Sequence, residues 1–275
     1  MALLRSVVLR NYRRFAGEVE LNLAPGLNLV HGPPGMGKST IVEAVAWCLL
    51  GPEALPAGTE VRSAGVADEA MVSLSFFAED EPTLVRTERG PQALRRGKAD
   101  PRPFSQAREA LFPAHCVPSN LISGTVLQRF LQGSPSGTER AVGTDRGWWG
   151  RDAAFRSSME ATCLFLSLVP DSAAVCLDFD PQGRPGVQLS RADPLTPEER
   201  YLATLASILG FARESCPDAP LLLDEPFLGL RRDRARAVEA TIDFLAGRQC
   251  VLLLSDPEDV GTVRERADRE LEVRG

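Results

Sequence analysis

Nine consecutive residues near the start of the chain have the types and the spacing needed to bind phosphate. They fit the pattern Gly-x-x-x-x-Gly-Lys-Ser/Thr at every required position, and they are Gly32, Pro33, Pro34, Gly35, Met36, Gly37, Lys38, Ser39 and Thr40. Glycines let successive backbone N–H groups turn inward around an anion. We expect Lys38 to reach the β- and γ-phosphates of a bound nucleotide and the Ser39 hydroxyl to bind Mg²⁺.

The residues on both sides of this phosphate loop predict the strand and the helix that it requires. Residues 27–30 (LNLV) are typical of a buried strand, and apolar residues recur through 41–49 before the stop signal Gly51-Pro52. The N-terminus of such a helix directs its N–H groups and its positive dipole end at the phosphate. A chance glycine turn is the alternative. It is disfavoured because Lys38 and Lys98 are the only lysines among 31 basic residues.

A second stretch, residues 220–226 (PLLLDEP), ends an apolar run with two carboxylates. A buried strand of an open α/β sheet would deliver both to its carboxyl end, where ligands bind in such sheets. We therefore expect Asp224 to hold Mg²⁺, directly or through water, and Glu225 to act as general base on the attacking water. Taken alone, the same run is also compatible with a strand that ends in a polar turn.

The chain as a whole is acidic, so contact with nucleic acid would need a local basic patch. It has 275 residues, a formal net charge of −6 and a hydrophobic content of 44%, which is enough for a proper core. Basic residues gather between 86 and 108, where the candidates for contact with DNA phosphates are Arg86, Arg89, Arg95, Arg96, Lys98 and Arg102. The plainer interpretation of this segment is a solvated loop.

The cysteines and the apolar segments favour a soluble, cytoplasmic protein. The 6 cysteines are scattered without a Cys-x-x-Cys pair, so we expect buried free thiols rather than disulfides or a zinc site. The sequence has no signal peptide and no apolar run approaching about 18 residues. We therefore expect no membrane partner.

A linker-like stretch, residues 133–150 (GSPSGTERAVGTDRGWWG), divides the chain into two halves. In the first half, alternating apolar residues predict strands at 19–23 and 72–76, with 83–89 as a partner of the second, and a helix is expected at 105–112. In the second half, an amphipathic helix is expected at 151–168, followed by strand, turn and strand within 175–189.

Together these motifs resemble the head of an SMC-like ATP-binding-cassette ATPase of the SbcC/Rad type, which acts in double-strand-break repair. The likeness covers nearly the whole chain in the right order. Residues 9–15 (LRNYRRF) resemble that family's Asn-Phe-Arg turn, and 41–44 (IVEA) resemble its first helix. Residues 127–131 (LQRFL), with Glu139-Arg140, resemble its glutamine loop, and 222–226 (LLDEP) resemble its magnesium and base strand.

The resemblance implies an α/β fold of the ABC-type P-loop NTPase head class, with a mixed central sheet, an antiparallel β subdomain and flanking helices. Residues 1–275 would form one head, with an N-terminal lobe (1–132), a linker (133–150) in place of a coiled coil and a C-terminal lobe (151–275). By analogy, Arg13 would contact nucleotide phosphates, and Gln128 would sense Mg²⁺ and the γ-phosphate or be an ordinary exposed residue. The implied cofactors are ATP and Mg²⁺. The implied partners are DNA, a nuclease subunit and a second head.

The chain also departs from that family. The long coiled coil is missing at 133–150, so either a coil has been removed from this sequence or the head is naturally minimal. Where the family reads Leu-Ser-Gly-Gly-Glu/Gln, residues 195–200 read LTPEER, so Thr196, Pro197 and Glu198 stand at the signature position. Thr196 as N-cap, Pro197 at the first helical position and Glu199 at the third predict a capping box. Arg231 replaces an aspartate, and Ser255-Asp256 replace a switch histidine.

These observations favour a Mg-ATP-binding and hydrolysing head of a DNA-repair or genome-defence ATPase, in which ATP closes a clamp and hydrolysis opens it. The altered signature keeps a second hypothesis open, a structural or regulatory clamp that binds ATP with little turnover, although Glu225 argues against it. A transporter ATPase subunit is disfavoured, since Gln128 lies about 90 residues after Lys38, farther than we expect in that group.

Overall fold

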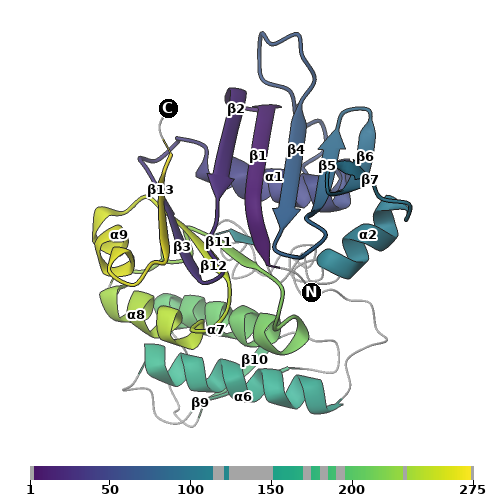
Figure 1. The fold of residues 1–275 in the computed structure, drawn as a ribbon. Helices are drawn as coiled ribbons and strands as arrows, with labels where there is room; N and C mark the ends of the chain where they lie inside the picture. Colours follow the sequence, from purple (N-terminus) through teal and green to yellow (C-terminus); the bar gives the residue numbers. More distant parts are fainter. Residues whose placement is uncertain are drawn as a thin grey trace.

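The computed structural model of the chain describes residues 3–113, 121–123, 151–169, 175–179, 185–189, 196–231 and 234–273. Figure 1 shows that they form an antiparallel sheet, a parallel sheet and a layer of helices. This arrangement confirms the predicted α/β class with an antiparallel β subdomain and flanking helices. None of the helices in this described part of the chain has both the length and the apolar character that crossing a membrane requires.

The antiparallel sheet comes from the first part of the chain. Its order is β2-β1-β4-β5-β6-β7, with β1 (Leu4–Tyr12), β2 (Phe15–Asn22), β4 (Met71–Phe76), β5 (Pro82–Thr87), β6 (Gly90–Arg95) and β7 (Lys98–Ala99). The predicted strands 19–23 and 72–76 and their partner 83–89 fall on β2, β4 and β5. The basic segment 86–108 is not a solvated loop, since it includes β6, β7 and most of α2 (Phe104–Leu111).

The parallel sheet positions the predicted site. Its order is β13-β3-β12-β11-β8, with β13 (Arg269–Glu272), β3 (Leu27–His31), β12 (Cys250–Leu254), β11 (Leu221–Asp224) and β8 (Leu121–Ser123). Every neighbouring pair of these described strands runs parallel, so the central sheet is not mixed as the resemblance implied, and the antiparallel strands form a separate sheet. Because β12 separates β3 from β11, the phosphate loop after β3 and the carboxylates after β11 emerge at one edge of the sheet, on either side of β12.

The parallel strands bury alternate residues on two faces, which explains their nearly continuous apolar sequences. One face packs on α1 (Lys38–Leu50) and the antiparallel sheet, through Val30, Leu222, Val251 and Leu253. The opposite face packs on α6 (Arg151–Leu168), α7 (Pro197–Ser215) and α8 (Arg234–Phe244), through Leu29, Leu221, Leu223, Leu252 and Leu254. Figure 1 shows these three helices as the layer below the sheet.

The remaining elements follow the sequence expectations closely. The helix after the phosphate loop ends at Gly51, and the short 3-10 helix η1 (Pro52–Ala54) follows it. The antiparallel pair of β9 (Val175–Phe179) and β10 (Pro185–Leu189) confirms the two predicted strands, and the predicted turn between them lies outside the described residues. The helix α9 (Pro257–Arg264) follows β12. The linker 133–150 lies outside the described residues, so the division into lobes 1–132 and 151–275 stays a prediction.

The expectation of free thiols is confirmed for some cysteines and wrong for another. Cys48 and Cys250 are free and buried as expected, and burial raises the pKa of each to about 12, whereas Cys163 is free but exposed. Cys216 is disulfide-bonded. Spacing along the chain did not reveal this bond, because it depends on which thiols the fold brings together.

A buried glutamine joins the two sheets. Gln249 directly precedes β12 and is 1% exposed. Its side chain accepts a hydrogen bond from the Leu4 N–H at 2.7 Å and donates to the carbonyl oxygens of Leu4 at 2.6 Å and Ala24 at 2.8 Å. Leu4 begins β1 and Ala24 lies between β2 and β3, so one amide ties the antiparallel sheet to the parallel sheet.

Candidate nucleotide-binding site

The phosphate loop between β3 and α1 has backbone that glycine adopts most readily. Gly35 and Gly37 have φ angles of 81° and 101°, in the left-handed region. Gly37 also lies tightly against the β1–β2 turn, because a Cβ there would come within 2.6 Å of the Arg14 Cδ. Since α1 begins at Lys38, the N–H groups of its first turn lie at the loop and are suited to an anion.

The side chain of Lys38 folds back against the phosphate loop. It is only 4% exposed, and its ammonium donates hydrogen bonds to the carbonyl oxygens of Gly32 at 2.8 Å and Pro33 at 3.1 Å. Both partners are neutral. A phosphate in the loop would replace these neutral acceptors with charged oxygens, which make stronger hydrogen bonds with an ammonium.

Asp224, the last residue of β11, faces the first turn of α1. It is 4% exposed, its carboxyl hydrogen-bonds with the Ser39 side chain, and its Oδ1 has no hydrogen-bond partner among the residues that the structure describes. Burial raises the pKa of Asp224 to about 6, opposed by the Ser39 hydrogen bond and by Lys38 and reinforced by Glu225 and Glu43. A buried carboxylate oxygen without a partner is costly, so this position favours a cation.

The residues at this point fit Mg²⁺ bound together with a nucleotide. Ser39 and Asp224 offer the hydroxyl and carboxylate oxygens that Mg²⁺ prefers, and such an ion takes its remaining ligands from phosphates and water. Nowhere in the described ranges do three or more His, Cys, Asp or Glu side chains gather as a metal-binding cluster. The fit is therefore to a metal shared with a ligand and not to a cage made by protein alone.

Glu225 lies next to Lys38 at the same edge of the sheet. Its Oε1 is 3.7 Å from the Lys38 Nζ and accepts a hydrogen bond from the Ser255 hydroxyl. Its φ angle is 50°, which is uncommon for a residue other than glycine, and its N–H donates to the Leu253 carbonyl at 2.9 Å. Two residues far apart in the sequence thus lie next to each other, while the roles of Lys38 in phosphate binding and of Glu225 as general base stay predictions.

Two predicted ligand contacts are not established. Arg13 pairs with Glu43 of α1, and its N–H donates to the Val61 carbonyl at 2.7 Å. A contact between Arg13 and phosphate therefore stays a prediction. Gln128 lies outside the described residues, as do Glu139 and Arg140, so its role as a sensor of Mg²⁺ and γ-phosphate also stays a prediction.

The signature-like start of α7 has the predicted capping box. Thr196 accepts from the Glu199 N–H at 3.2 Å, and the Glu199 carboxylate accepts from the Thr196 N–H at 2.8 Å, with Pro197 at the first helical position. The Glu198 carboxylate accepts from the Arg231 N–H at 2.8 Å. The first turn of α7 is therefore bonded to its own acids and to the loop after Glu225.

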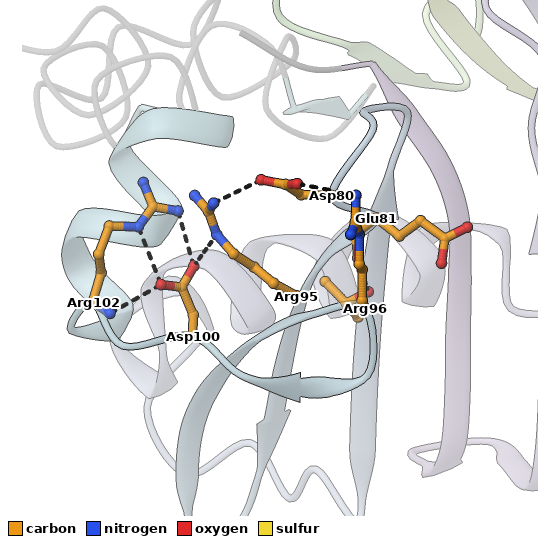
Figure 2. A network of polar contacts seen from close by, with 7 residues as sticks. Asp80, Glu81, Arg95, Arg96, Asp100 and Arg102 are labelled. Atoms are coloured by element: carbon orange, nitrogen blue, oxygen red, sulfur yellow. Dashed lines mark hydrogen bonds and ion pairs between the residues drawn. The ribbon is translucent and has the colours of Figure 1, made fainter.

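The basic residues proposed for DNA are largely bound within the head. Figure 2 shows Asp100 between Arg95 and Arg102, and Arg95 and Arg96 near Asp80. Arg86 is turned inward, donating to the Cys48 carbonyl at 3.1 Å and lying over the rings of Trp47 and Phe104. Arg89, with a side chain 87% exposed, Arg96 at 71% and the exposed Lys98 remain the best placed for an external phosphate.

Sequence reasoning missed two residues that touch the site. The sequence indicated Ser255 only as part of a pair that replaces the switch histidine of the resembling family, although its hydroxyl donates a hydrogen bond to Glu225. The hydroxyl of Tyr201 in α7 donates a hydrogen bond to the Pro226 carbonyl at 2.8 Å. The Tyr201 ring packs closely on Gly229, because a Cβ at that glycine would lie 2.6 Å from the ring atom Cε2. A polar residue directly after the apolar run 250–254 was the available signal for Ser255, because β12 had to end at the same edge as β11.

Sequence comparisons find related segments in proteins named for chromosome partition and for DNA replication and repair. The sequence model of a family described as an AAA domain matches residues 6–87. The chromosome partition protein Smc of Desulfitobacterium hafniense is 41% identical over 46 residues, which are 17% of this chain and 4% of that protein. The DNA replication and repair protein RecF of Beutenbergia cavernae is 28% identical over 137 residues, which are 49% of this chain and 32% of that protein.

Solved SMC heads have the same architecture. The SMC head bound to the C-terminal winged-helix domain of ScpA aligns with a TM-score of 0.75 at 17% identity, and the SMC head domain from Thermotoga maritima with 0.63 at 17%. Each alignment covers 98% of this chain and 94% of the other. At such identities the likeness shows the fold. The chain therefore has the fold of an SMC-like ATP-binding-cassette ATPase head, as its motifs predicted.

Proposed function

We propose that this chain is the Mg-ATP-binding and ATP-hydrolysing head of an SMC-like ATPase that acts in chromosome maintenance or DNA repair, in the cytoplasm. The supporting observation is the convergence of a lysine, a hydroxyl and two carboxylates at one sheet edge, with an unpartnered buried oxygen on Asp224. The Smc and RecF relatives support the assignment to DNA metabolism. DNA and a second head or a partner subunit are the proposed partners.

The side chains have distinct roles in this proposal. Lys38 binds the β- and γ-phosphates, and Ser39 and Asp224 hold Mg²⁺, which when bound neutralises charge on the phosphate oxygens. Glu225 accepts a proton from a water molecule while the oxygen of that water attacks the γ-phosphorus. The bond between the γ-phosphorus and the oxygen that bridges it to the β-phosphate breaks. ADP and inorganic phosphate result. Hydrolysis would then reopen whatever contact ATP had closed.

A clamp that binds ATP with little turnover is the second candidate. The observation that favours it is the first turn of α7, where the side chains of Thr196, Glu198 and Glu199 already accept hydrogen bonds from backbone N–H groups. In the family that the chain resembles, this turn completes the nucleotide site of a partner head. A turn that is already capped by carboxylates is poorly suited to receiving another anion.

Direct measurement distinguishes the two candidates. ATP binding is titrated with and without Mg²⁺, and steady-state turnover is measured with and without DNA, on the parent and on Glu225→Gln. Turnover that depends on Glu225 supports the ATPase. Mg-dependent binding with equal, very slow turnover in both proteins supports the clamp. No Mg-dependent ATP binding by the parent would overturn both.

A further inference from the structure

Glu225 is attached at two points to the chain that leaves β12. Its backbone N–H donates to the Leu253 carbonyl at 2.9 Å, and its Oε1 accepts from the Ser255 hydroxyl. Leu253 and Ser255 are two positions apart, so one short segment holds both the main chain and the side chain. The left-handed backbone of Glu225, at φ 50°, is the kind of conformation that persists only where its surroundings impose it.

The turn that contains Ser255 is itself anchored. Asp256 caps α9 by accepting from the Glu258 N–H at 2.9 Å, and its other oxygen lies 3.3 Å from Arg234. The same guanidinium donates to both oxygens of Asp259, whose side chain is 2% exposed, at 2.5 to 2.8 Å. These contacts bind the starts of α8 and α9 together, so the Ser255 hydroxyl has a fixed position.

The contacts of the Glu225 carboxylate are also directional. The Lys38 ammonium and the Ser255 hydroxyl both meet Oε1, and Oε2 takes part in neither contact. A general base must direct an oxygen at a water proton within hydrogen-bond reach. A hydroxyl that fixes Oε1 also fixes the direction of Oε2, because the carboxylate is planar.

We propose that Ser255 is a positioning residue for ATP hydrolysis: its hydroxyl holds Oε1 of Glu225 so that Oε2 is directed at the attacking water. The inference rests on the ATPase function proposed above and assigns a role to a residue outside its motifs. Ser255 acts through Glu225 and not on the nucleotide, so its loss should lower kcat and leave ATP affinity unchanged.

The test compares two substitutions of nearly equal shape, Ser255→Thr and Ser255→Val, together with Ser255→Ala. The hydroxyl of Ser255→Thr should retain most of the parental kcat. We expect Ser255→Val and Ser255→Ala to lose about 10- to 100-fold, the effect typical of a misdirected catalytic group. In a Glu225→Gln background the same substitutions should cause no further loss, because the two residues act as a unit. Thr262→Ala is the control, since this exposed hydroxyl bonds only within α9, to the Glu258 carbonyl.

The outcomes separate this inference from the function on which it rests. A parent that hydrolyses ATP, with Ser255→Val at the same kcat, overturns the role of Ser255 alone. Equal losses in Ser255→Thr and Ser255→Val, a weakened ATP affinity, or losses that add to that of Glu225→Gln also overturn it. A parent that neither binds nor hydrolyses ATP overturns the proposed function and this inference with it. Urea unfolding of each variant identifies any loss that comes from misfolding.

Discussion

The Lys38 ammonium nitrogen lies 3.7 Å from Oε1 of Glu225, so the cation and the carboxylate at the centre of the site partly neutralise each other. Both side chains are largely buried, with exposures of 4% and 16%. Removing either one leaves the other without its opposite charge, which is unfavourable in a poorly solvated place. Substitutions at the two positions therefore need controls that report folding as well as function.

Lys38→Ala should abolish measurable ATP binding while the protein stays folded. The substitution removes hydrogen bonds to charged phosphate oxygens, and each such bond contributes about 1.5–3 kcal/mol, or about 10- to 100-fold in affinity. Fluorescence titration with a labelled ATP analogue measures the loss. Lys98→Ala is the matched control, because Lys98 is the other lysine of the chain and is exposed on β7. Equal affinities in the two variants would refute the phosphate-loop assignment.

Glu225→Gln should keep ATP affinity and lose turnover. The amide retains the shape of the side chain but cannot accept the proton, and loss of a general base typically costs about 10²–10⁴-fold. Steady-state phosphate release and equilibrium ATP binding are compared with those of Glu239→Gln, an exposed position on α8. A turnover by Glu225→Gln that matches this control would mean that another group activates the water.

Asp100→Asn should destabilise the head at neutral pH, and by progressively less as the pH falls below 3.8. Hydrogen bonds from Arg102, helped by Arg95, hold the pKa of Asp100 well below its ordinary value of 3.8. An acid whose pKa is lower in the folded state stabilises that state above the unfolded pKa, and the contribution fades as the pH falls below 3.8. We expect a loss of about 1–3 kcal/mol at pH 7.

Urea unfolding at pH 7 and at pH 3 measures this difference, with the exposed Asp68→Asn as control. Figure 2 shows why the effect should be local: the Asp100 carboxylate joins the end of β6 to the start of α2. A loss of the same size at both pH values would show that the charge of Asp100 is not what stabilises the turn.

DNA binding, if the head has it, should depend on Arg96 and Lys98 more than on Arg95. Arg95 is held by two carboxylates, whereas Arg96 and Lys98 are exposed. Each phosphate contact contributes about −0.9 to the slope of log affinity against log salt. Changing Arg96 and Lys98 together to alanine should therefore flatten the slope by up to about 1.8. An unaltered slope would move the DNA contact elsewhere on the head.

ATP-dependent self-association should be weak in the parent and stronger when Pro197 and Glu198 are both changed to glycine. The substitution removes a carboxylate that would repel the phosphate of a partner head, and it restores the N–H that proline lacks. It also removes the bond between Glu198 and the Arg231 N–H. Sedimentation with Mg²⁺ and a non-hydrolysable ATP analogue measures the change. A parent that already dimerises tightly would show that its start of α7 works as a signature.

The parts of the site that were predictable depend on residues that lie close together in the sequence. The phosphate loop needs glycine at fixed positions, and Gly37 indeed combines a left-handed backbone with close contact to Arg14. The capping box of α7 is equally local, since Thr196 and Glu199 are only three residues apart. Asp224 and Glu225 were recognisable because a strand buried on both faces has an unbroken apolar run, which stops where the side chains reach the site.

The parts that were not predictable depend on pairs far apart in the sequence. Arg95 was expected to be available to DNA, and the fold brings Asp80, 15 residues away, against it. Arg102 is an exception, because its partner Asp100 is only 2 residues away in the sequence. The Ser255 hydroxyl donates to Glu225 because β12 is the neighbour of β11 in the sheet. The sequences of the two strands do not predict which strands are neighbours. The same holds for Arg13, whose pairing with Glu43 depends on where α1 packs.

Gln249 gives the head a mechanical property. Its three hydrogen bonds join the start of β1, the chain before β3 and the start of β12, and the two bonds to Leu4 are buried. A relative shift of the two sheets would have to break these hydrogen bonds, so a load on the antiparallel sheet would be transmitted to the parallel sheet and to the phosphate loop at its edge.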